Sequence, residues 1–174
     1  MKAKKRFGQN FLTDKKLLED LTSLINMSSQ DKFLEIGPGK GDLTENLINF
    51  CDCYFGIEVD RDLLTILKNR FPKNKKAFIN RDILKLNPSE IYPLNKFRVI
   101  GNIPYNISSP ILDWCEKNYE KILDVHFMLQ KEFALRCIGN ERSSSYGKLS
   151  VICNYLYEVT ILKEVTKDFF NPIP

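Results

Sequence analysis

Short apolar runs alternate with helix-patterned segments through most of this sequence, and this alternation restricts its fold more than any other feature. The apolar runs have the length of single strands and lie at residues 33–36, 53–58, 77–80, 97–101 and 125–129. Segments with the apolar spacing of helices lie between or after them, at residues 40–50, 61–70, from 110 onward, and 131–137. Such alternation implies right-handed crossovers and a mostly parallel sheet covered on both faces. We therefore predict a doubly wound α/β fold.

Several predicted helices begin with a capping signal. Thr13 stands before a helix that we expect to end near residue 26, and Asp60 stands before the helix at 61–70. Ser109 is the predicted cap of a helix whose first position is Pro110, where a missing N–H costs nothing. These signals place the helix starts directly after strand ends.

The C-terminal part of the chain is less clearly patterned. Residues 139–147, GNERSSSYG, are polar and serine-rich and predict a loop. Apolar residues are so dense at 149–162 that periodicity does not separate helix from strand there. The chain closes with FFNPIP and no helical pattern after it.

Length and composition limit the class of protein. A chain of 174 residues is enough for one domain with a single core, and 43% hydrophobic and 28% charged residues are typical of a globular protein. No apolar run approaches the roughly 20 residues that span a bilayer, and the first residues lack the apolar stretch of a secretory signal. We expect a cytoplasmic protein without a membrane partner. Its net charge of +4 is compatible with an RNA partner, and no feature suggests an oligomer.

Residues that bind metals are scattered along the chain. The five cysteines form no pair of CxxC motifs, which argues against a disulfide framework and a structural zinc site. Cys51 and Cys53 alternate as strand residues do, so we expect them to share a face and to pack in the core. The single histidine, His126, lies in a predicted strand, and we interpret it as a core or supporting residue. The sequence predicts no metal site.

Four predicted strands end in polar or glycine-rich sequence, and ligands of a doubly wound sheet bind beyond these ends. The first runs into EIGPGKG, whose Gly37 and Gly39 permit a tight turn with backbone close to a ligand. Glu58 ends the second strand, where a carboxylate can accept hydrogen bonds from both ribose hydroxyls. The last glycine comes one place earlier than in the dinucleotide fingerprint GxGxxG, and Asp42 occupies the expected position. These features favour a ribonucleoside ligand that need not carry a pyrophosphate.

The third and fourth strand ends supply further polar groups. Asp82, in NRDIL, can accept from an adenine amino group while Ile83 packs on the ring, although such an aspartate is more often a helix cap or a solvated acid. The fourth strand runs into VIGNIPYNISSP, which places Asn102 and Tyr105 around Ile103 and Pro104. Taken alone, that stretch is more typical of a turn.

Together these motifs resemble the class I S-adenosylmethionine-dependent methyltransferases, which have a Rossmann-like fold. More narrowly, they resemble the ribosomal RNA small-subunit adenine dimethyltransferases of the KsgA type. The resemblance runs from KKRFGQNFL to FFNPIP and includes, in the family's order, EIGPGKG, GIEVDRDL, RDIL, GNIPYNIS, FMLQKEFALR and YGKLSV. It implies dimethylation of N6 of adjacent adenines near the 3′ end of small-subunit (16S-type) ribosomal RNA during ribosome biogenesis. The implied cofactor is S-adenosyl-L-methionine, and the implied partner is the pre-small-subunit particle.

The resemblance also implies a role for each matching residue. The positions that hold or line the cofactor pocket are Gln9, Asn10, Leu12, Gly37, Gly39, Glu58, Asp82, Ile83 and Asn102. The catalytic positions are Asn102, Ile103, Pro104, Tyr105 and Phe170. Tyr105 matches the ring that stacks on the flipped target adenine, and Phe170 matches a second stacking ring.

These roles give the NIPY stretch a chemical purpose. The exocyclic nitrogen of adenine is a poor nucleophile, because its lone pair is delocalised into the ring. If the Asn102 side chain and the carbonyl of Ile103 or Pro104 accept its two N–H bonds, the nitrogen can pyramidalise and turn its lone pair toward a methyl group. Pro104 fixes the backbone that aims these acceptors. An in-line displacement of this kind is favoured by alignment and needs neither a strong base nor a metal.

Three other functions share parts of the pattern. The large-subunit ribosomal RNA adenine methyltransferases that confer macrolide resistance also carry NIPYNIS, but Phe7-Gly8, MLQKEFALR and YGKLSV favour the small-subunit kind. A non-catalytic ribosome-assembly or RNA-binding factor has no need to keep the cofactor residues together. A nicotinamide oxidoreductase is disfavoured by the glycine spacing.

The resemblance finally implies a domain organisation. The family continues past FxPxP into a small helical lobe that helps to grip the RNA, whereas this sequence stops at Pro174. We expect residues 1–174 to be the methyltransferase catalytic domain without that lobe, with residues 1–12 as a basic, cofactor-contacting segment. Lys131 and Arg136 are candidates for contacts with RNA phosphates, although isolated charges are more often surface residues.

Overall fold

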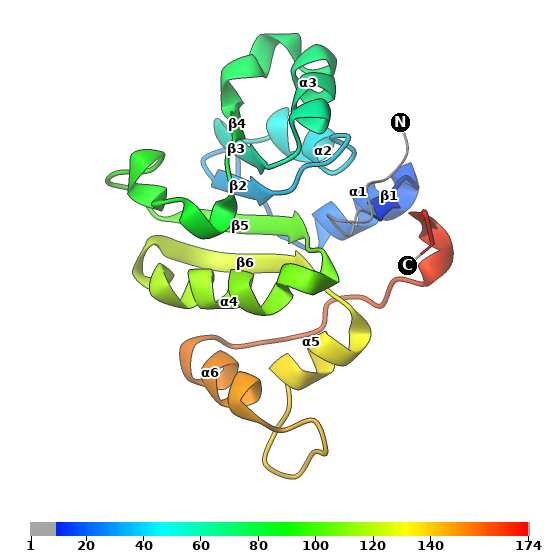
Figure 1. The fold of residues 1–174 in the computed structure, drawn as a ribbon, viewed down its shortest axis with the longest axis vertical. Coiled ribbons are helices and arrows are strands. Elements are labelled where there is room, and N and C mark those ends of the chain that lie inside the picture. The colour runs from blue at the N-terminus through cyan, green and yellow to red at the C-terminus, as the bar shows by residue number, and fades with distance from the viewer. Residues whose placement is uncertain (1–9, 174) are drawn as a thin grey trace.

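A five-stranded sheet forms the centre of the molecule, in a computed structural model that describes residues 10–173 (Figure 1). The strand order is β4-β3-β2-β5-β6, and every neighbouring pair is parallel. The strands are β2 (Lys32–Ile36), β3 (Cys53–Glu58), β4 (Phe78–Asn80), β5 (Phe97–Asn102) and β6 (Ile122–Met128). The predicted doubly wound α/β fold is confirmed. From β2 the chain adds β3 and β4 on one side, and it then crosses back to add β5 and β6 on the other side of β2. Folds of this kind bind ligands at this switch point, between β2 and β5.

Helices cover both faces of the sheet, with α2 (Thr44–Ile48) and α3 (Arg61–Arg70) on one face and α4 (Ser108–Lys117) on the other. The other helices are α1 (Lys15–Ser23), α5 (Lys131–Cys137) and α6 (Lys148–Leu156). Because alternate strand residues face opposite ways, Phe33 packs with Leu47 of α2 and Leu67 of α3, while Leu34 packs with Trp114 of α4. Both faces of β2 are therefore buried from solvent, which explains its nearly continuous apolar sequence.

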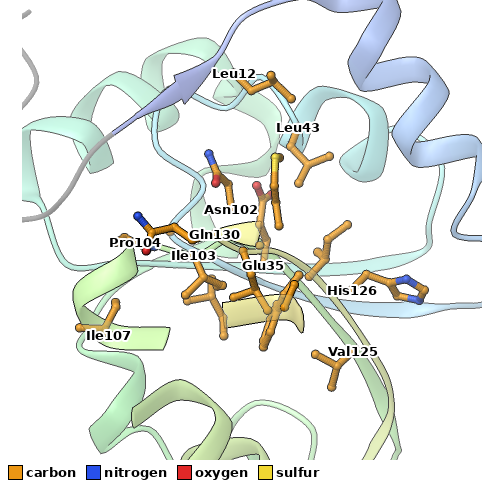
Figure 2. A pocket seen from close by; sticks show the side chains of 18 of the residues that line it. Leu12, Glu35, Leu43, Asn102, Ile103, Pro104, Ile107, Val125, His126 and Gln130 are labelled. Carbon is orange, nitrogen blue, oxygen red and sulfur yellow. The ribbon is translucent and has the colours of Figure 1, made fainter. Parts of the chain in front are cut away.

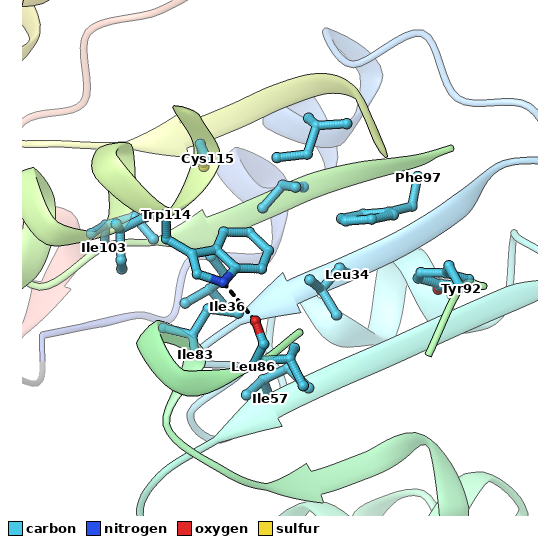
Figure 3. Packing of buried hydrophobic residues seen from close by; sticks show 13 residues of the cluster. Leu34, Ile36, Ile57, Ile83, Leu86, Tyr92, Phe97, Ile103, Trp114 and Cys115 are labelled. Carbon is cyan, nitrogen blue, oxygen red and sulfur yellow. Dashed lines mark hydrogen bonds between the residues drawn. The ribbon is translucent and has the colours of Figure 1, made fainter. Parts of the chain in front are cut away.

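Trp114 links α4 to the chain that follows β4 (Figure 3). Its indole is 5% exposed, and the Nε1–H donates to the backbone carbonyl of Leu86 at 2.9 Å. A buried indole thereby keeps its hydrogen bond. The same chain segment begins with Asp82 and Ile83, so this contact helps to place two predicted site residues.

Two predicted helix caps are wrong. Asp14, not Thr13, caps α1, and its Oδ1 accepts from the backbone N–H of Leu17 at 2.8 Å. Helix α1 ends at Ser23, three residues before the predicted end. Helix α4 begins at Ser108 without a side-chain cap, so Ser109 is not its cap. A preceding short 3-10 helix, Tyr105–Ile107, leads directly into α4 and supplies its first turn.

Other boundaries differ from the sequence analysis for identifiable reasons. Helix α2 covers only residues 44–48 of the predicted 40–50, because the glycine loop extends further and Gly41 has φ +89°. Strand β6 begins three residues earlier than predicted and ends at Met128. The ambiguous stretch from 149 becomes helix α6 up to Leu156 and has no regular structure after it.

The two cysteines predicted to share a face pack on opposite sides of the sheet. Cys51 precedes β3 and packs with Phe33, while Cys53 is the first residue of β3 and packs against the cluster of Leu34. The Cys51 thiol is also a donor to the backbone carbonyl of Leu47 at 3.2 Å. Their interpretation as packing residues is confirmed, but not their common face.

A second, two-stranded sheet was not predicted. Strand β1 (Phe11–Leu12) pairs antiparallel with β7 (Phe170–Asn171), which joins the two ends of the described chain (Figure 1). Sequence periodicity does not reveal strands of two residues, since a pattern needs more residues to repeat. This small sheet lies beside the carboxyl end of β6, because Leu12, Phe170 and Met128 share one apolar cluster.

Candidate active site

One large cavity opens at the carboxyl ends of the central strands (Figure 2). Its volume is about 1260 Å³. Among the residues that line it are all the described residues predicted for the site: Asn10, Leu12, Gly37, Gly39, Glu58, Asp82, Ile83, Asn102, Ile103, Pro104, Tyr105 and Phe170. Gln9 lies outside the described residues. The cavity also runs along β6 and residues 156–165, which makes it larger than a site for one small ligand.

Glu58 and the glycine loop form the first part of the site. Glu58 is 4% exposed; its Oε2 accepts from the backbone N–H of Gly39 at 3.1 Å and its Oε1 from that of Asp60 at 2.9 Å. Burial raises the pKa of Glu58, and these two N–H groups act against that rise. Each oxygen keeps a further lone pair for a ligand donor. The loop therefore holds this carboxylate in place rather than neutralising it.

Gly37 leaves space in front of the loop. It has φ +64°, and a Cβ built there would meet no atom within 4 Å. A side chain at this position would thus be strained by the backbone and would also enter open space at the cavity. Two causes therefore favour glycine at position 37: its positive φ, and the open space of the cavity that a side chain would occupy.

Asp82 caps a short helix and also lines the cavity. Its Oδ1 accepts from the backbone N–H of Leu84 at 3.0 Å and caps the short 3-10 helix Ile83–Lys85. The cap interpretation of Asp82 is thereby confirmed. A carboxylate has two oxygens, so capping through one leaves Oδ2 to accept from a ligand. Ile83, 5% exposed, presents its apolar side chain beside it.

Asn102 is the last residue of β5 and is fixed from two directions. Its side-chain Nδ2 donates to the backbone carbonyl of Asn10 at 2.9 Å. The next residue, Ile103, donates its backbone N–H to the carbonyl of Met128 at 3.0 Å, which continues the pairing of β5 with β6. Figure 2 shows Asn102 between the strand that carries Leu12 and the turn at Ile103 and Pro104.

The turn after Asn102 distinguishes the two candidate carbonyls. The Pro104 carbonyl already accepts from the backbone N–H of Ile107 at 3.1 Å and from the Ser108 hydroxyl at 3.3 Å. Within residues 10–173, the Ile103 carbonyl accepts no hydrogen bond. Of the two carbonyls, that of Ile103 is therefore the one with no partner inside the described chain. The sequence left this choice open.

The two predicted stacking rings have different surroundings. Tyr105 is 59% exposed at the start of the 3-10 helix, so its ring face is open to a partner. Phe170 is half-buried and packs against the apolar cluster of Leu12, Leu17 and Leu18. Both line the cavity, but only Tyr105 stands out from the protein surface.

Glu35 is a cavity residue for which sequence reasoning assigned no role. It is 2% exposed and accepts from the Thr44 hydroxyl at 2.8 Å and from the Tyr54 hydroxyl at 2.5 Å. Burial raises its pKa to about 7, although these hydrogen bonds favour the charged form. The available signal was an acidic residue inside an otherwise apolar strand, since such residues are rarely buried without a reason.

Lys131 and Arg136, the candidates for RNA contacts, both belong to α5. Lys131 forms a surface ion pair with Glu164 at 2.9 Å. His126 lies in β6 and is a neighbour of Arg98, with 3.2 Å between Nε2 and Nη2. No cluster of three or more histidine, cysteine or acidic residues that could hold a metal occurs between residues 10 and 173, and no helix in that range is long and apolar enough to cross a membrane.

Known proteins share both the sequence and the fold. The family described as "Ribosomal RNA adenine dimethylase" matches residues 1–174. A protein of Methylobacillus flagellatus named ribosomal RNA small subunit methyltransferase A is 41% identical over 172 residues, which cover 99% of this chain and 67% of that protein. The crystal structure of a dimethyladenosine transferase from Plasmodium falciparum matches with a TM-score of 0.80 and 28% identity, over 94% of this chain and 59% of the other.

A 23S ribosomal RNA methyltransferase, ErmE, has a similar structure, with a TM-score of 0.75 and 28% identity over 95% of this chain and 65% of the other. This chain spans about two thirds of the length of the curated relatives it matches. The family match extends over every residue of the chain, and the site residues that carry the resemblance line one cavity. The chain belongs to the ribosomal RNA adenine dimethylase family.

Proposed function

We propose that this chain is the catalytic domain of an enzyme that dimethylates N6 of adjacent adenines near the 3′ end of small-subunit ribosomal RNA. The relatives at 39% to 41% identity are named small-subunit methyltransferases, whereas the 23S ribosomal RNA methyltransferase is 28% identical. This difference favours the small-subunit substrate over the large-subunit one. The proposed setting is the pre-small-subunit particle in the cytoplasm, with the enzyme acting as a monomer.

S-adenosylmethionine fits the donors and acceptors of the site. The Glu58 carboxylate is placed to accept from ribose hydroxyls, and Asp82 and Ile83 offer an acceptor and an apolar surface for adenine. The open space in front of Gly37 leaves room for the backbone to approach the ligand closely. When bound, this cofactor supplies an electrophilic methyl group on a sulfonium. Gln9, Asn10 and Leu12 are proposed as further contacts.

The pair of acceptors at the end of β5 is the observation that carries the proposal. The Asn102 amide donates through Nδ2, which directs Oδ1 away from Asn10, and the Ile103 carbonyl accepts nothing from the described chain. Two such oxygens can accept both N–H bonds of an adenine amino group and free its lone pair for attack. They also stabilise the positive charge that develops on that nitrogen.

Aromatic rings would hold the target base outside the RNA stack. Tyr105 follows Pro104 and is mostly exposed, which suits a ring that stacks on a flipped adenine. Phe170 lines the same cavity and is proposed as a second ring. The methylated nitrogen carries a positive charge and gives one N–H proton to water, so the chain needs to orient two reactants and its own side chains need not act as acid or base.

The test replaces the proposed acceptor. Asn102→Ala should lower methyl transfer about a hundredfold or more, because one preorganised electrostatic contact to the reacting group is lost. Transfer is measured with methyl-labelled S-adenosylmethionine and small subunits that lack the modification. Binding of S-adenosylmethionine, S-adenosylhomocysteine and NAD is measured in parallel by thermal shift, where a ligand at 100 times its Kd adds about 2.7 kcal/mol.

Asn49→Ala is the matched control, since Asn49 is exposed and only donates to the Glu45 carbonyl. It should transfer methyl groups as the unchanged protein does. Full turnover by a folded Asn102→Ala variant would refute the role of Asn102. Cofactor binding without transfer to either ribosomal subunit would favour a non-catalytic assembly factor, and transfer to large subunits alone would favour the macrolide-resistance type.

A further inference from the structure

The side-chain amide of Asn102 has a fixed direction in the absence of substrate. Its partner is the backbone carbonyl of Asn10, which can only accept a hydrogen bond. The atom that faces it, 2.9 Å away, must therefore be Nδ2, and Oδ1 must face the other way. A flipped amide would bring two oxygens together. Asn10 thus determines which end of the Asn102 amide is offered to a substrate.

The strand that directly follows this carbonyl, β1, is paired at both of its residues. In β1, Phe11 is paired with Asn171 and Leu12 with Phe170. Leu12 is 5% exposed and belongs to an apolar cluster against which Phe170 packs. The position of Asn10 therefore depends on residues about 160 positions away along the chain, because β7 is the only strand paired with β1 in the described part of the chain.

The same strand also contacts the glycine loop. A Cβ on Gly39 would lie 3.1 Å from the Phe11 ring, so the ring covers this glycine closely. The ammonium group of Lys40 is 4.6 Å from the centre of the same ring, within cation–π range. Residues 10–12 thus touch both the loop of the proposed cofactor pocket and the proposed catalytic amide.

We propose that residues 10–12, clasped by Phe170 and Asn171, form a positioning element that presents Asn102 Oδ1 to the target amino group. This inference rests on the proposed function. We call the pairing of residues 11–12 with residues 170–171 the clasp. Phe170 then has a second role besides stacking on a base, because its half-buried ring packs against the cluster of Leu12 and stabilises this pairing. The two roles predict different effects of the same substitutions.

The first measurement is the exchange of the Asn102 side-chain NH₂ protons by NMR in the whole chain without ligand. Asn102→Asp identifies the signal by its loss. The hydrogen bond to Asn10 should slow exchange about tenfold relative to Asn95, whose exposed side chain makes no hydrogen bond within residues 10–173. Exchange as fast as that of Asn95 would overturn the proposal, whatever the activity of the protein.

The second measurement compares three variants of the clasp. Phe170→Ala should speed exchange of the Asn102 amide and lower kcat about tenfold or more, with the Kd for S-adenosylmethionine changed less. Phe170→Leu refills the apolar cluster and should restore both slow exchange and kcat. Phe169→Ala, a control on the neighbouring and more exposed ring, should change neither.

The outcomes separate the two roles of Phe170. If Phe170→Leu loses kcat while the Asn102 amide stays protected, stacking explains the loss and Phe170 does not act on kcat through the clasp. If the Asn102 amide stays protected in Phe170→Ala, the clasp itself is refuted. If Phe170→Ala fails to fold, the comparison of Phe170→Leu with the unchanged protein still shows whether Phe170 affects kcat through stacking or through the clasp. If the unchanged protein shows a protected amide but transfers no methyl group, the proposed function fails while the geometry of the clasp stands, so the two failures are distinguishable.

Discussion

Two charged side chains are buried on the same face of the central sheet, and their surroundings differ in kind. Arg98 lies in β5 opposite Phe33 of β2, and Glu35 lies one same-face position further along β2. Arg98 is 6% exposed and Glu35 is 2% exposed. They mark opposite ends of the sheet, since Glu35 lines the cavity and Arg98 does not.

Arg98 is fully compensated. Its guanidinium contacts the carboxylates of Asp31 at 2.5 Å and Asp124 at 2.9 Å. It also donates to the backbone carbonyls of Ile25 at 2.6 Å and Asn26 at 3.2 Å, directly after α1. One planar side chain thereby ties two strands and the end of a helix together, which lysine, with a single donor centre, does not do.

Glu35 has only neutral partners. The hydroxyls of Tyr54 and Thr44 donate to it, and no described cation lies beside it, so burial raises its pKa to about 7. The contrast with Arg98 shows where the fold accepts an uncompensated charge. The far end of the sheet pairs its buried arginine with carboxylates, whereas the end that lines the ligand cavity holds Glu35 with neutral partners only, as is typical of functional sites.

The largest expected effect comes from breaking the compensated cluster. Arg98→Met leaves Asp31 and Asp124 close together without a cation, and it should lower the free energy of unfolding by about 3 to 5 kcal/mol. Urea titration at pH 7 measures this. Adding Asp31→Asn and Asp124→Asn to Arg98→Met should recover part of the loss, because the repelling charges are gone.

Arg70 provides the control for Arg98. It forms ion pairs with Asp42 and Glu45, both at 2.7 Å, but its side chain is 32% exposed. Arg70→Met should therefore cost about 1 kcal/mol or less. Equal losses for the two arginines would show that burial of Arg98 does not set its contribution.

The sequence predicted the elements of this fold better than the two buried charges. Strand and helix alternation identified all five central strands, and glycine spacing with Glu58 and Asn102 located the cavity. Arg98 and Glu35 stood in apolar strands without any local sign of their partners, because these partners come from distant parts of the chain. The pairing of β1 with β7 was not predicted for the same reason, and only the geometry of the turn shows that the Pro104 carbonyl is already hydrogen-bonded while that of Ile103 is not.

A smaller effect that depends on pH should come from Glu35. Its pKa is about 7 in the folded state against an ordinary 4.5, so its stabilising contribution is complete below pH 4.5 and is lost as pH rises through 7. The shift corresponds to about 3 kcal/mol at most. Glu35→Gln keeps an acceptor for Tyr54 and Thr44 without a titration. Relative to this variant, the unchanged protein should lose stability between pH 5 and pH 8.

The measurement is the difference in unfolding free energy between the two proteins across that pH range. Groups with shifted pKa values that do not interact with Glu35, such as Asp124, are present in both proteins and cancel in the difference. A difference that stays constant with pH would mean that Glu35 is charged in the folded state throughout. The contrast with Arg98 would then lose its basis.

The smallest effect, and one of opposite sign, should come from Asp124. Burial acts to raise its pKa, but the hydrogen bonds and charges of His126 and Arg98 outweigh burial and lower it to about 2 from an ordinary 3.8. Its contribution is therefore present above pH 3.8 and is lost as pH falls through 2. Because this side chain is 38% exposed, solvent screening reduces the contribution to about 1 kcal/mol.

Asp124→Asn should accordingly be less stable than the unchanged protein at pH 6, and the difference should shrink toward pH 2.5. Asp113→Asn, on the exposed face of α4, is the matched control and should show a much smaller difference at pH 6. Two carboxylates on one face of one sheet would then respond to pH in opposite directions. The stabilising contribution of Asp124, which is paired with Arg98, would be lost in acid, and that of Glu35, which has neutral partners, would be lost as pH rises. Slopes of the same sign for Glu35 and Asp124 would contradict this, because a raised pKa and a lowered pKa require slopes of opposite sign.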